Sequence, residues 1–201
     1  MIGADVSHEI RNVLSVIGEY AGLLDDLTGL AEKGGSLDYA KLRRASQSIT
    51  KQVKRGTLMM ERFSRFAHAA DEPVASFDLG ALVENMAALA QRRAALAGCR
   101  LEAEPPGQAM PVQGDPFALQ HLVFSAIQAM LEFSDKGEHL RVSAAREGAA
   151  AAVCISAAAA GGEPSGRIRQ QLAAAADECG ASLKTSWAEG RLSLILTIPV
   201  E

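Results

Sequence analysis

Apolar residues recur at three- and four-residue spacing through the first third of the chain, in two runs separated by Gly34-Gly35-Ser36. This spacing places the apolar side chains on one face of a helix. It therefore predicts two long helices joined by a glycine turn, forming an antiparallel hairpin over residues 1–72. The apolar positions are Ile2, Val6, Ile10, Val13, Ile17, Ala21, Leu24 and Leu27, then Leu42, Ala45, Ile49, Val53, Gly56, Met59, Met60, Phe63 and Phe66.

A hairpin of this kind leaves part of the apolar face of both helices exposed to water. Pairing two hairpins into a four-helix bundle covers that surface. We therefore expect a homodimer assembled through the hairpin.

The pattern changes after Pro73, where shorter apolar runs alternate with turn residues. Residues 79–97, 115–133 and 164–179 have helical spacing, whereas 140–145, 151–157, 182–187 and 192–198 are typical of short strands. Residues 73–201 are thus predicted to form an α/β layer domain. The fold class expected for the whole chain is α+β.

Composition and charge narrow the function classes. Apolar residues make up 48% of the chain and charged residues 22%, which is ordinary for a globular protein. An isoelectric point near 5.6 and few aromatic residues disfavour nucleic-acid binding. The longest apolar stretch, 149–160, is too short to cross a membrane. We expect a cytoplasmic protein whose three dispersed cysteines are reduced thiols and hold no metal.

His8 is the residue with the clearest chemical potential. It lies about 200° around the helix from Val6, so its imidazole should face solvent on the same side as Arg11, Asn12 and Ser15. A neutral imidazole nitrogen can act as a nucleophile toward phosphorus. Glu9 could orient the ring or take its proton. A lone exposed histidine on a helix is, however, more often an uninvolved surface residue.

The residues around His8 make the prediction more specific. Ser7-His8-Glu9-Ile10-Arg11-Asn12 resembles the phospho-acceptor box of bacterial histidine kinases, and the second helix ends in Glu61-Arg62-Phe63-Ser64-Arg65-Phe66 like their phosphotransfer hairpin. The segment from Asp115 to Ser134 resembles the helix that carries the asparagines of their ATP site. The segment from Cys179 to Pro199 resembles the end of their catalytic domain.

The departures from that family are equally informative. Ser125 and Ala129 occupy the two positions that are usually asparagine, and Ser156 with four alanines stands where an Asp-x-Gly-x-Gly loop is expected. Phosphoryl transfer from ATP needs a metal ion and a positioned nucleotide. The resemblance therefore implies a reduced histidine-kinase-like α/β sandwich that binds no ATP and holds no cofactor of its own.

The chain is thus similar to histidine phosphotransferases that resemble degenerate kinases, which relay a phosphoryl group between receiver aspartates in a two-component phosphorelay. By this resemblance the catalytic residues are His8, Glu9 and Asn12, and the receiver supplies the Mg²⁺. The alternative is a non-catalytic pseudokinase that binds or sequesters a response regulator or a kinase.

The second predicted helix carries many cations and only Glu61 as an acid. Such charge runs usually keep the outer face of a bundle hydrated. The pocket of a receiver is acidic, so the same run could steer a receiver onto His8. The residues proposed to meet the receiver are Arg11, Ser15, Arg55 and Arg62.

Overall fold

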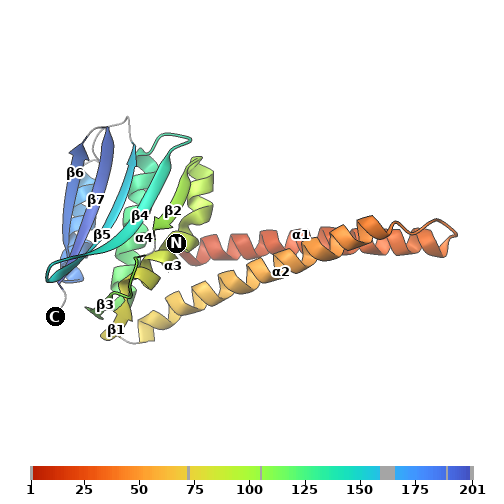
Figure 1. Cartoon of the computed structure of the whole chain (residues 1–201), viewed down its shortest axis with the longest axis horizontal. Coiled ribbons are helices and arrows are strands. Elements are labelled where there is room, and N and C mark those ends of the chain that lie inside the picture. Colours follow the sequence, from red (N-terminus) through yellow and green to blue (C-terminus); the bar gives the residue numbers. More distant parts are fainter. Residues whose placement is uncertain (1, 72, 105, 159–165, 189, 200–201) are drawn as a thin grey trace. The chain divides into compact units, whose positions relative to one another are not determined.

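The computed structural model describes residues 2–71, 73–104, 106–158, 166–188 and 190–199. It divides into two compact units, Met1–Ser64 and Arg65–Glu201. The long hairpin and the domain of strands and helices can both be followed in Figure 1. The predicted fold class, a helical hairpin followed by an α/β domain, is confirmed.

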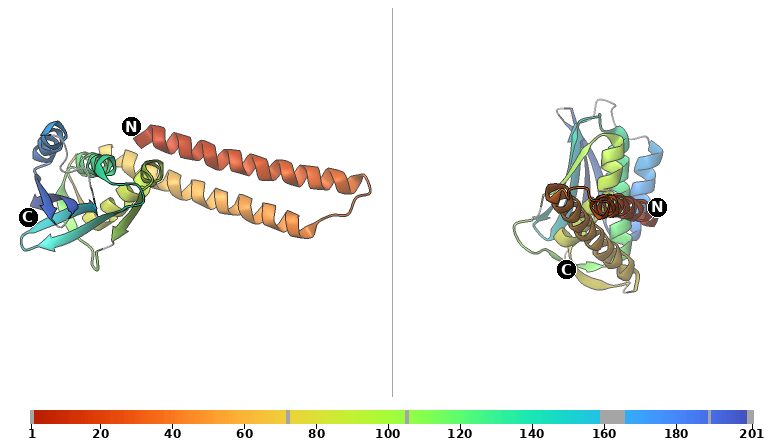
Figure 2. Two further views of the ribbon diagram at one scale, coloured as in Figure 1. Left: turned by 90° about the horizontal axis from the view of Figure 1, so that it is seen from above. Right: turned by 90° about the vertical axis from the view of Figure 1, so that its right-hand side faces the viewer.

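The hairpin consists of α1, Ile2–Glu32, and α2, Tyr39–His68. The two helices lie side by side and run in opposite directions (Figure 2). Gly34 has a φ of 89°, a left-handed conformation that favours glycine, so it turns the chain where the sequence indicated a break. Asp38 caps the N-terminus of α2, because its Oδ1 accepts hydrogen bonds from the Ala40 and Lys41 N–H groups, both at 3.0 Å.

The second unit contains a mixed sheet of five strands in the order β2-β4-β5-β7-β6. These strands are Arg100–Glu104, His139–Glu147, Ala150–Ala158, Arg191–Pro199 and Ser182–Ala188. Only the pairing of β2 with β4 is parallel. Strands β4 to β7 extend the predicted strands by one to three residues, whereas β2 was not predicted from the sequence.

Three helices cover one face of this sheet, as Figure 2 shows: α3, Leu79–Ala97, α4, Pro116–Phe133, and α5, Gly166–Glu178. Buried leucines, valines and isoleucines of β5 and β7 alternate with half-buried residues, so the core lies between the sheet and the helices. The predicted helix boundaries agree for α3 and nearly for α4. The predicted start of α5 at Pro164 lies outside the described residues.

A second, smaller sheet pairs β1, Ala75–Asp78, with β3, Pro111–Gly114. Asp78 joins it to the helix layer, because its Oδ1 accepts hydrogen bonds from the N–H groups of Gly80 and Met110, both at 3.0 Å. One carboxylate therefore caps α3 and fixes the chain that enters β3. Neither short strand was predicted from the sequence. A short 3₁₀ helix, Ala69–Asp71, follows α2.

Candidate functional site

The phospho-acceptor box lies on the first turns of α1. One side of the helix is buried there, and the other side is exposed to solvent. Val6 and Val13 are buried at 5% and 4% exposure, whereas His8 is exposed. The spacing of apolar residues thus orients His8 as the sequence predicted. Because its ring is exposed, a partner molecule can reach His8 without any rearrangement of the hairpin.

Other proposed site residues of α1 share the exposed side of His8. Arg11, Asn12 and Ser15 are all exposed, and they occupy the turns of α1 that follow His8. On α2, Arg55 is exposed and Arg62 is half-buried. The exposed members offer hydrogen-bonding and cationic groups to a partner, and their roles remain predictions.

Glu9 has a different environment from the one that the sequence suggested. It is buried at 7% exposure, and its Oε1 forms an ion pair with the Arg55 guanidinium of α2. The sequence predicts separate roles for the two residues, Glu9 as an acid/base helper and Arg55 as a receiver contact. In the structure they bond to one another, so Glu9 is directed toward α2 and does not share the exposed side of His8.

The position of Glu9 on the helical wheel contains the signal for this pairing. Glu9 lies about 40° from Val13 and about 60° from Val6 around α1, which places it on the apolar face. A carboxylate on that face needs a charged or hydrogen-bonding partner when it is buried. A search for a cation on the opposite helix would have found the run that includes Arg55.

The two helices come close together next to this ion pair. A Cβ atom built on Gly56 would lie 3.2 Å from Cγ1 of Val13, a tight contact. Gly56 is buried and is adjacent in sequence to Arg55, and Val13 is one turn after Glu9. The absence of a side chain at Gly56 thus allows the close helix spacing at which Glu9 meets Arg55.

The helix that resembles the kinase ATP-site helix is α4. Ser125 is exposed and Ala129 is buried, and both line a groove of about 250 Å³ between α4 and α5. Its polar side chains are Ser125, Gln128, Glu132 and Gln171. With its amide oxygen turned toward α3, Gln128 accepts hydrogen bonds from Arg93 Nε at 2.7 Å and from its Nη1 at 2.9 Å. This groove is below the ~300 to 1,000 Å³ typical of small-molecule sites.

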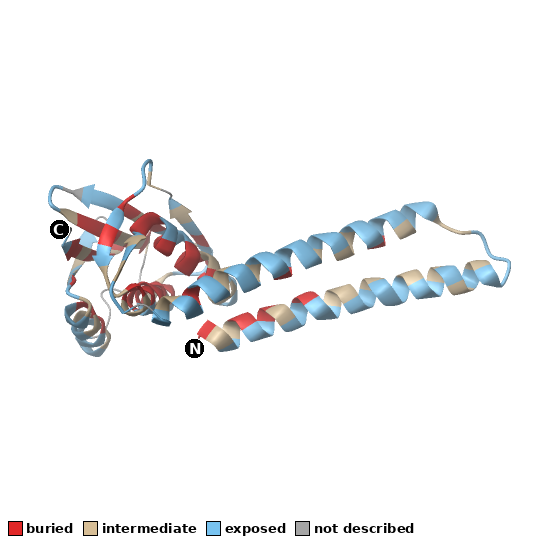
Figure 3. Cartoon of the chain, turned by 90° about the horizontal axis from the view of Figure 1, so that it is seen from below, coloured by how far each residue is buried: buried red, intermediate tan, exposed pale blue. Residues whose placement is uncertain are grey.

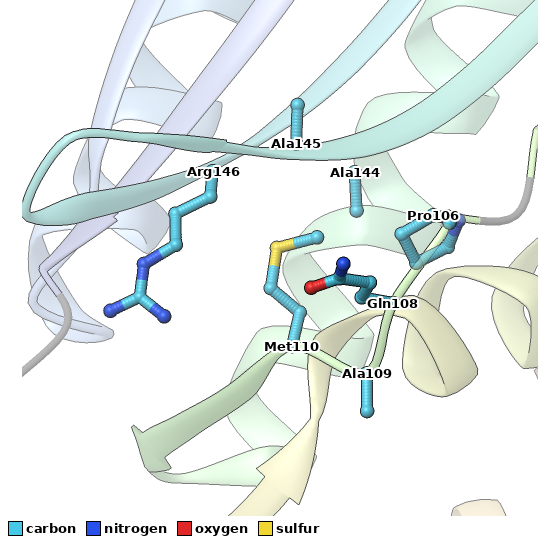
Figure 4. Close-up of a pocket in the computed structure, with 8 residues that line it drawn as sticks. Pro106, Gln108, Ala109, Met110, Ala144, Ala145 and Arg146 are labelled. Carbon is cyan, nitrogen blue, oxygen red and sulfur yellow. The ribbon is translucent and has the colours of Figure 1, made fainter.

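A larger cavity, about 360 Å³, lies between the loop before β3 and the end of β4. In Figure 4 the Met110 and Gln108 side chains lie below Ala144, and Arg146 extends from the same strand. Among the described residues that line it, Arg146 is the one with a charge. The described part of its lining thus contains no nucleophile or acid/base pair, and none of the residues of the phospho-acceptor box.

The cysteines give no candidate site. Cys99 is buried, whereas Cys154 and Cys179 are half-buried, and all three are free thiols. Burial raises the pKa of the Cys99 and Cys179 thiols, which favours the unreactive protonated form. Among the residues that the structure describes, no three His, Cys, Asp or Glu side chains gather as metal ligands. Nor is any described helix long and apolar enough to cross a membrane.

Comparisons with known proteins agree with the fold. The histidine kinase AdeS of Acinetobacter baumannii is 15% identical, with a TM-score of 0.55 over 96% of this chain and 98% of that chain. A histidine kinase from Burkholderia phymatum is 17% identical, with a TM-score of 0.52 over 94% and 98% of the two chains. The chain therefore has a histidine-kinase-like fold over both of its units.

A third similar structure is the histidine kinase ThkA in complex with the response regulator protein TrrA. It is 15% identical, with a TM-score of 0.54 over 99% of this chain and 61% of that chain. No protein-family model matches the sequence, and no curated protein matches it. At these identities the likeness concerns the fold.

Proposed function

We propose that this protein is a histidine phosphotransfer protein of a two-component phosphorelay, which accepts and donates a phosphoryl group through His8 without binding ATP. The observation that carries the proposal is the exposed His8 on α1, within a Ser-His-Glu-Ile-Arg-Asn box, in a chain with a histidine-kinase-like fold. The protein would act in the cytoplasm as a homodimer of hairpins.

The proposed transfer is a substitution at phosphorus. A neutral His8 ring nitrogen forms the new bond, the bond from phosphorus to the receiver's aspartyl oxygen breaks, and the aspartate leaves with the electron pair as a carboxylate. The imidazole then loses the proton on its other ring nitrogen to a base, the role proposed for Glu9. Asn12, one turn after His8, would hold water if the protein also removes phosphate. Mg²⁺ would belong to the receiver.

The absence of ATP chemistry is proposed from α4. Ser125 and Ala129 offer no side-chain amide to a metal ion or phosphate. The groove beside them, about 250 Å³, is small for a nucleotide. The segment in which a kinase carries its glycine loop includes residues 159–165, which lie outside the described residues. The residue types at 125 and 129 therefore carry this part of the proposal.

The proposed partner is a receiver domain, either of a response regulator or of a hybrid kinase. ThkA, which has a similar fold, is recorded with a response regulator. The exposed cations Arg11 and Arg55, together with Ser15 and Arg62, would meet the acidic surface around the receiver's aspartate. Because exposed charges act over about 10 Å, docking should weaken as salt concentration rises.

A second candidate function is a non-catalytic pseudokinase that binds or sequesters a regulator or a kinase. The Glu9–Arg55 ion pair favours it, because the proposed helper is held away from His8. The two functions differ in whether His8 ever carries phosphate.

The deciding experiment incubates the wild-type chain and His8→Ala with a panel of phosphorylated receivers. The relay proposal expects acid-labile, base-stable label on the wild-type chain and none on His8→Ala, with receiver binding retained by both. Labelled ATP with Mg²⁺ should leave both chains unlabelled. Binding without label from any receiver would favour the pseudokinase, and label from ATP would restore the kinase interpretation.

A further inference from the structure

The ion pair between Glu9 and Arg55 joins an enclosed group to an accessible one. The Glu9 side chain is 9% exposed, whereas the Arg55 side chain is 57% exposed. A docking partner can therefore reach the guanidinium but not the carboxylate. The Arg55 charge is thus shared between a buried group of this chain and the surface that a receiver would approach.

The helix geometry separates Glu9 from the histidine beside it. Adjacent residues of a helix point about 100° apart, and here one is buried and the other exposed. The close approach of Gly56 to Val13 keeps α2 near α1 at this level. While Arg55 holds it, the Glu9 carboxylate is directed toward α2.

We infer that Arg55 is a positioning residue that withholds Glu9 from His8 and releases it when an acidic receiver surface takes the guanidinium. This inference rests on the proposed phosphotransfer function. A buried carboxylate that loses a bonded cation is destabilised. Glu9 then turns outward to solvent, where its flexible side chain can reach the proton on the His8 ring. Docking thus supplies the base at the moment when a phosphoryl donor is present.

A small phosphoryl donor separates this effect from receiver docking. Phosphoramidate transfers its phosphoryl group to histidine directly: the new P–N bond to His8 forms, the P–N bond to the amine breaks, and ammonia leaves. The ring proton of His8 goes to a base. Since no receiver is present, no acidic surface competes with Glu9 for the Arg55 guanidinium. The wild-type chain therefore reacts while Glu9 is still held away from His8.

The test compares labelling rates of Arg55→Met, Arg55→Lys and the double variant Arg55→Met/Glu9→Gln with the wild type, using phosphoramidate. Arg55→Met should react about 100-fold faster, at the lower end of the ~10²- to 10⁴-fold that an acid/base helper contributes. Arg55→Lys, which keeps the ion pair, should restore the wild-type rate. The double variant Arg55→Met/Glu9→Gln should lose this increase in labelling rate. Arg167→Met on α5, an exposed arginine far along the sequence, is the matched control.

With a phosphorylated receiver as donor, Arg55→Met should raise KM because a docking charge is lost, while kcat is maintained or raised. Arg55→Gln, which can still donate a hydrogen bond, is the second variant in case Arg55→Met does not fold by circular dichroism. Equal phosphoramidate rates in the wild type and both uncharged variants would overturn the inference and leave the relay intact. A wild-type chain that no donor labels would overturn the proposed function itself.

Discussion

At the scale of single residues, the neighbours His8 and Glu9 show how burial decides what a side chain can do. The apolar spacing of α1 is sufficient to predict that His8 is exposed, because Val6 and Val13 define the buried side. The pairing of Glu9 with Arg55 depends on residues 46 positions apart. The helical wheel indicates that Glu9 needs a cation from the opposite helix, but it does not contain the spacing between the two helices, so Arg55 could not be singled out among the cations of α2.

A second residue-scale feature is an aromatic cluster at the end of α2. The ring centroid of Phe66 lies 5.4 Å from the ring centroid of Phe117 and 5.4 Å from that of His121. The ring centroids of Phe117 and His121 are 4.7 Å apart. Partial burial of the imidazole lowers the pKa of His121 from its ordinary value of 6.5. The folded chain therefore favours the neutral ring, although one side of the ring remains exposed.

This cluster predicts a pH dependence of stability. As pH falls through 6.5, the unfolded state binds the His121 proton before the folded state does, so stability is lost below that pH and is fully present above it. His121→Gln should reduce the difference in midpoint of urea unfolding between pH 7.5 and pH 5.5. His139→Gln, at an exposed position of β4, is the control. An unchanged pH dependence in His121→Gln would show that the ring does not contribute.

At the scale of elements, length determines what the sequence could predict. The long helices and strands β4 to β7 span seven to 31 residues and carry many repeats of their period. Strands β1 and β3 have only four residues each, and β3 begins with a proline, which weakens its strand signal. Strand β2, Arg100–Glu104, has just two apolar residues, and its parallel pairing with β4 is a long-range contact.

The close approach of α1 and α2 gives an element-scale prediction. Gly56→Leu should destabilise the hairpin by about 1 to 3 kcal/mol, because the side chain would be forced against Val13. This loss should exceed the gain of up to about 1 kcal/mol that replacing a helical glycine brings. Thermal unfolding followed by circular dichroism measures the change.

Gly22→Leu is the matched control for this substitution. Gly22 lies on α1 with no atom within 4 Å of an added Cβ, so the variant should unfold at the wild-type temperature or above it. Equal stability of the two leucine variants would contradict the close packing at Gly56.

At the scale of the whole molecule, the two units differ in how completely they bury their apolar residues. Figure 3 shows dense burial in the sheet domain and mostly exposed or intermediate residues along the hairpin. The apolar stripe predicted from the sequence exists, yet many of its members are only half-buried within one chain. These are Ile10, Ile17, Leu24 and Leu27 on α1 and Leu42, Ile49, Met59 and Phe63 on α2.

This incomplete burial supports the proposal of a homodimer. Each apolar side chain that moves from half-buried to buried contributes roughly 25 cal/mol per Å² of apolar surface removed from water. A second hairpin can cover the free side of every half-buried position at once, because the two copies carry the same stripe. We therefore expect light scattering on the full chain at micromolar concentration to give about 42 kDa, twice the 21.1 kDa of one chain.

The stripe also identifies the variants that test this assembly. Ile49→Glu would place a charge among apolar side chains of both copies, a burial that is costly without a partner. The variant should therefore shift the protein toward monomer while circular dichroism still reports a helical chain. Thr50→Glu, at the next position of α2 but exposed, introduces the same charge off the stripe and should remain dimeric. A monomeric wild-type chain, or equal association of the two variants, would contradict assembly through this stripe.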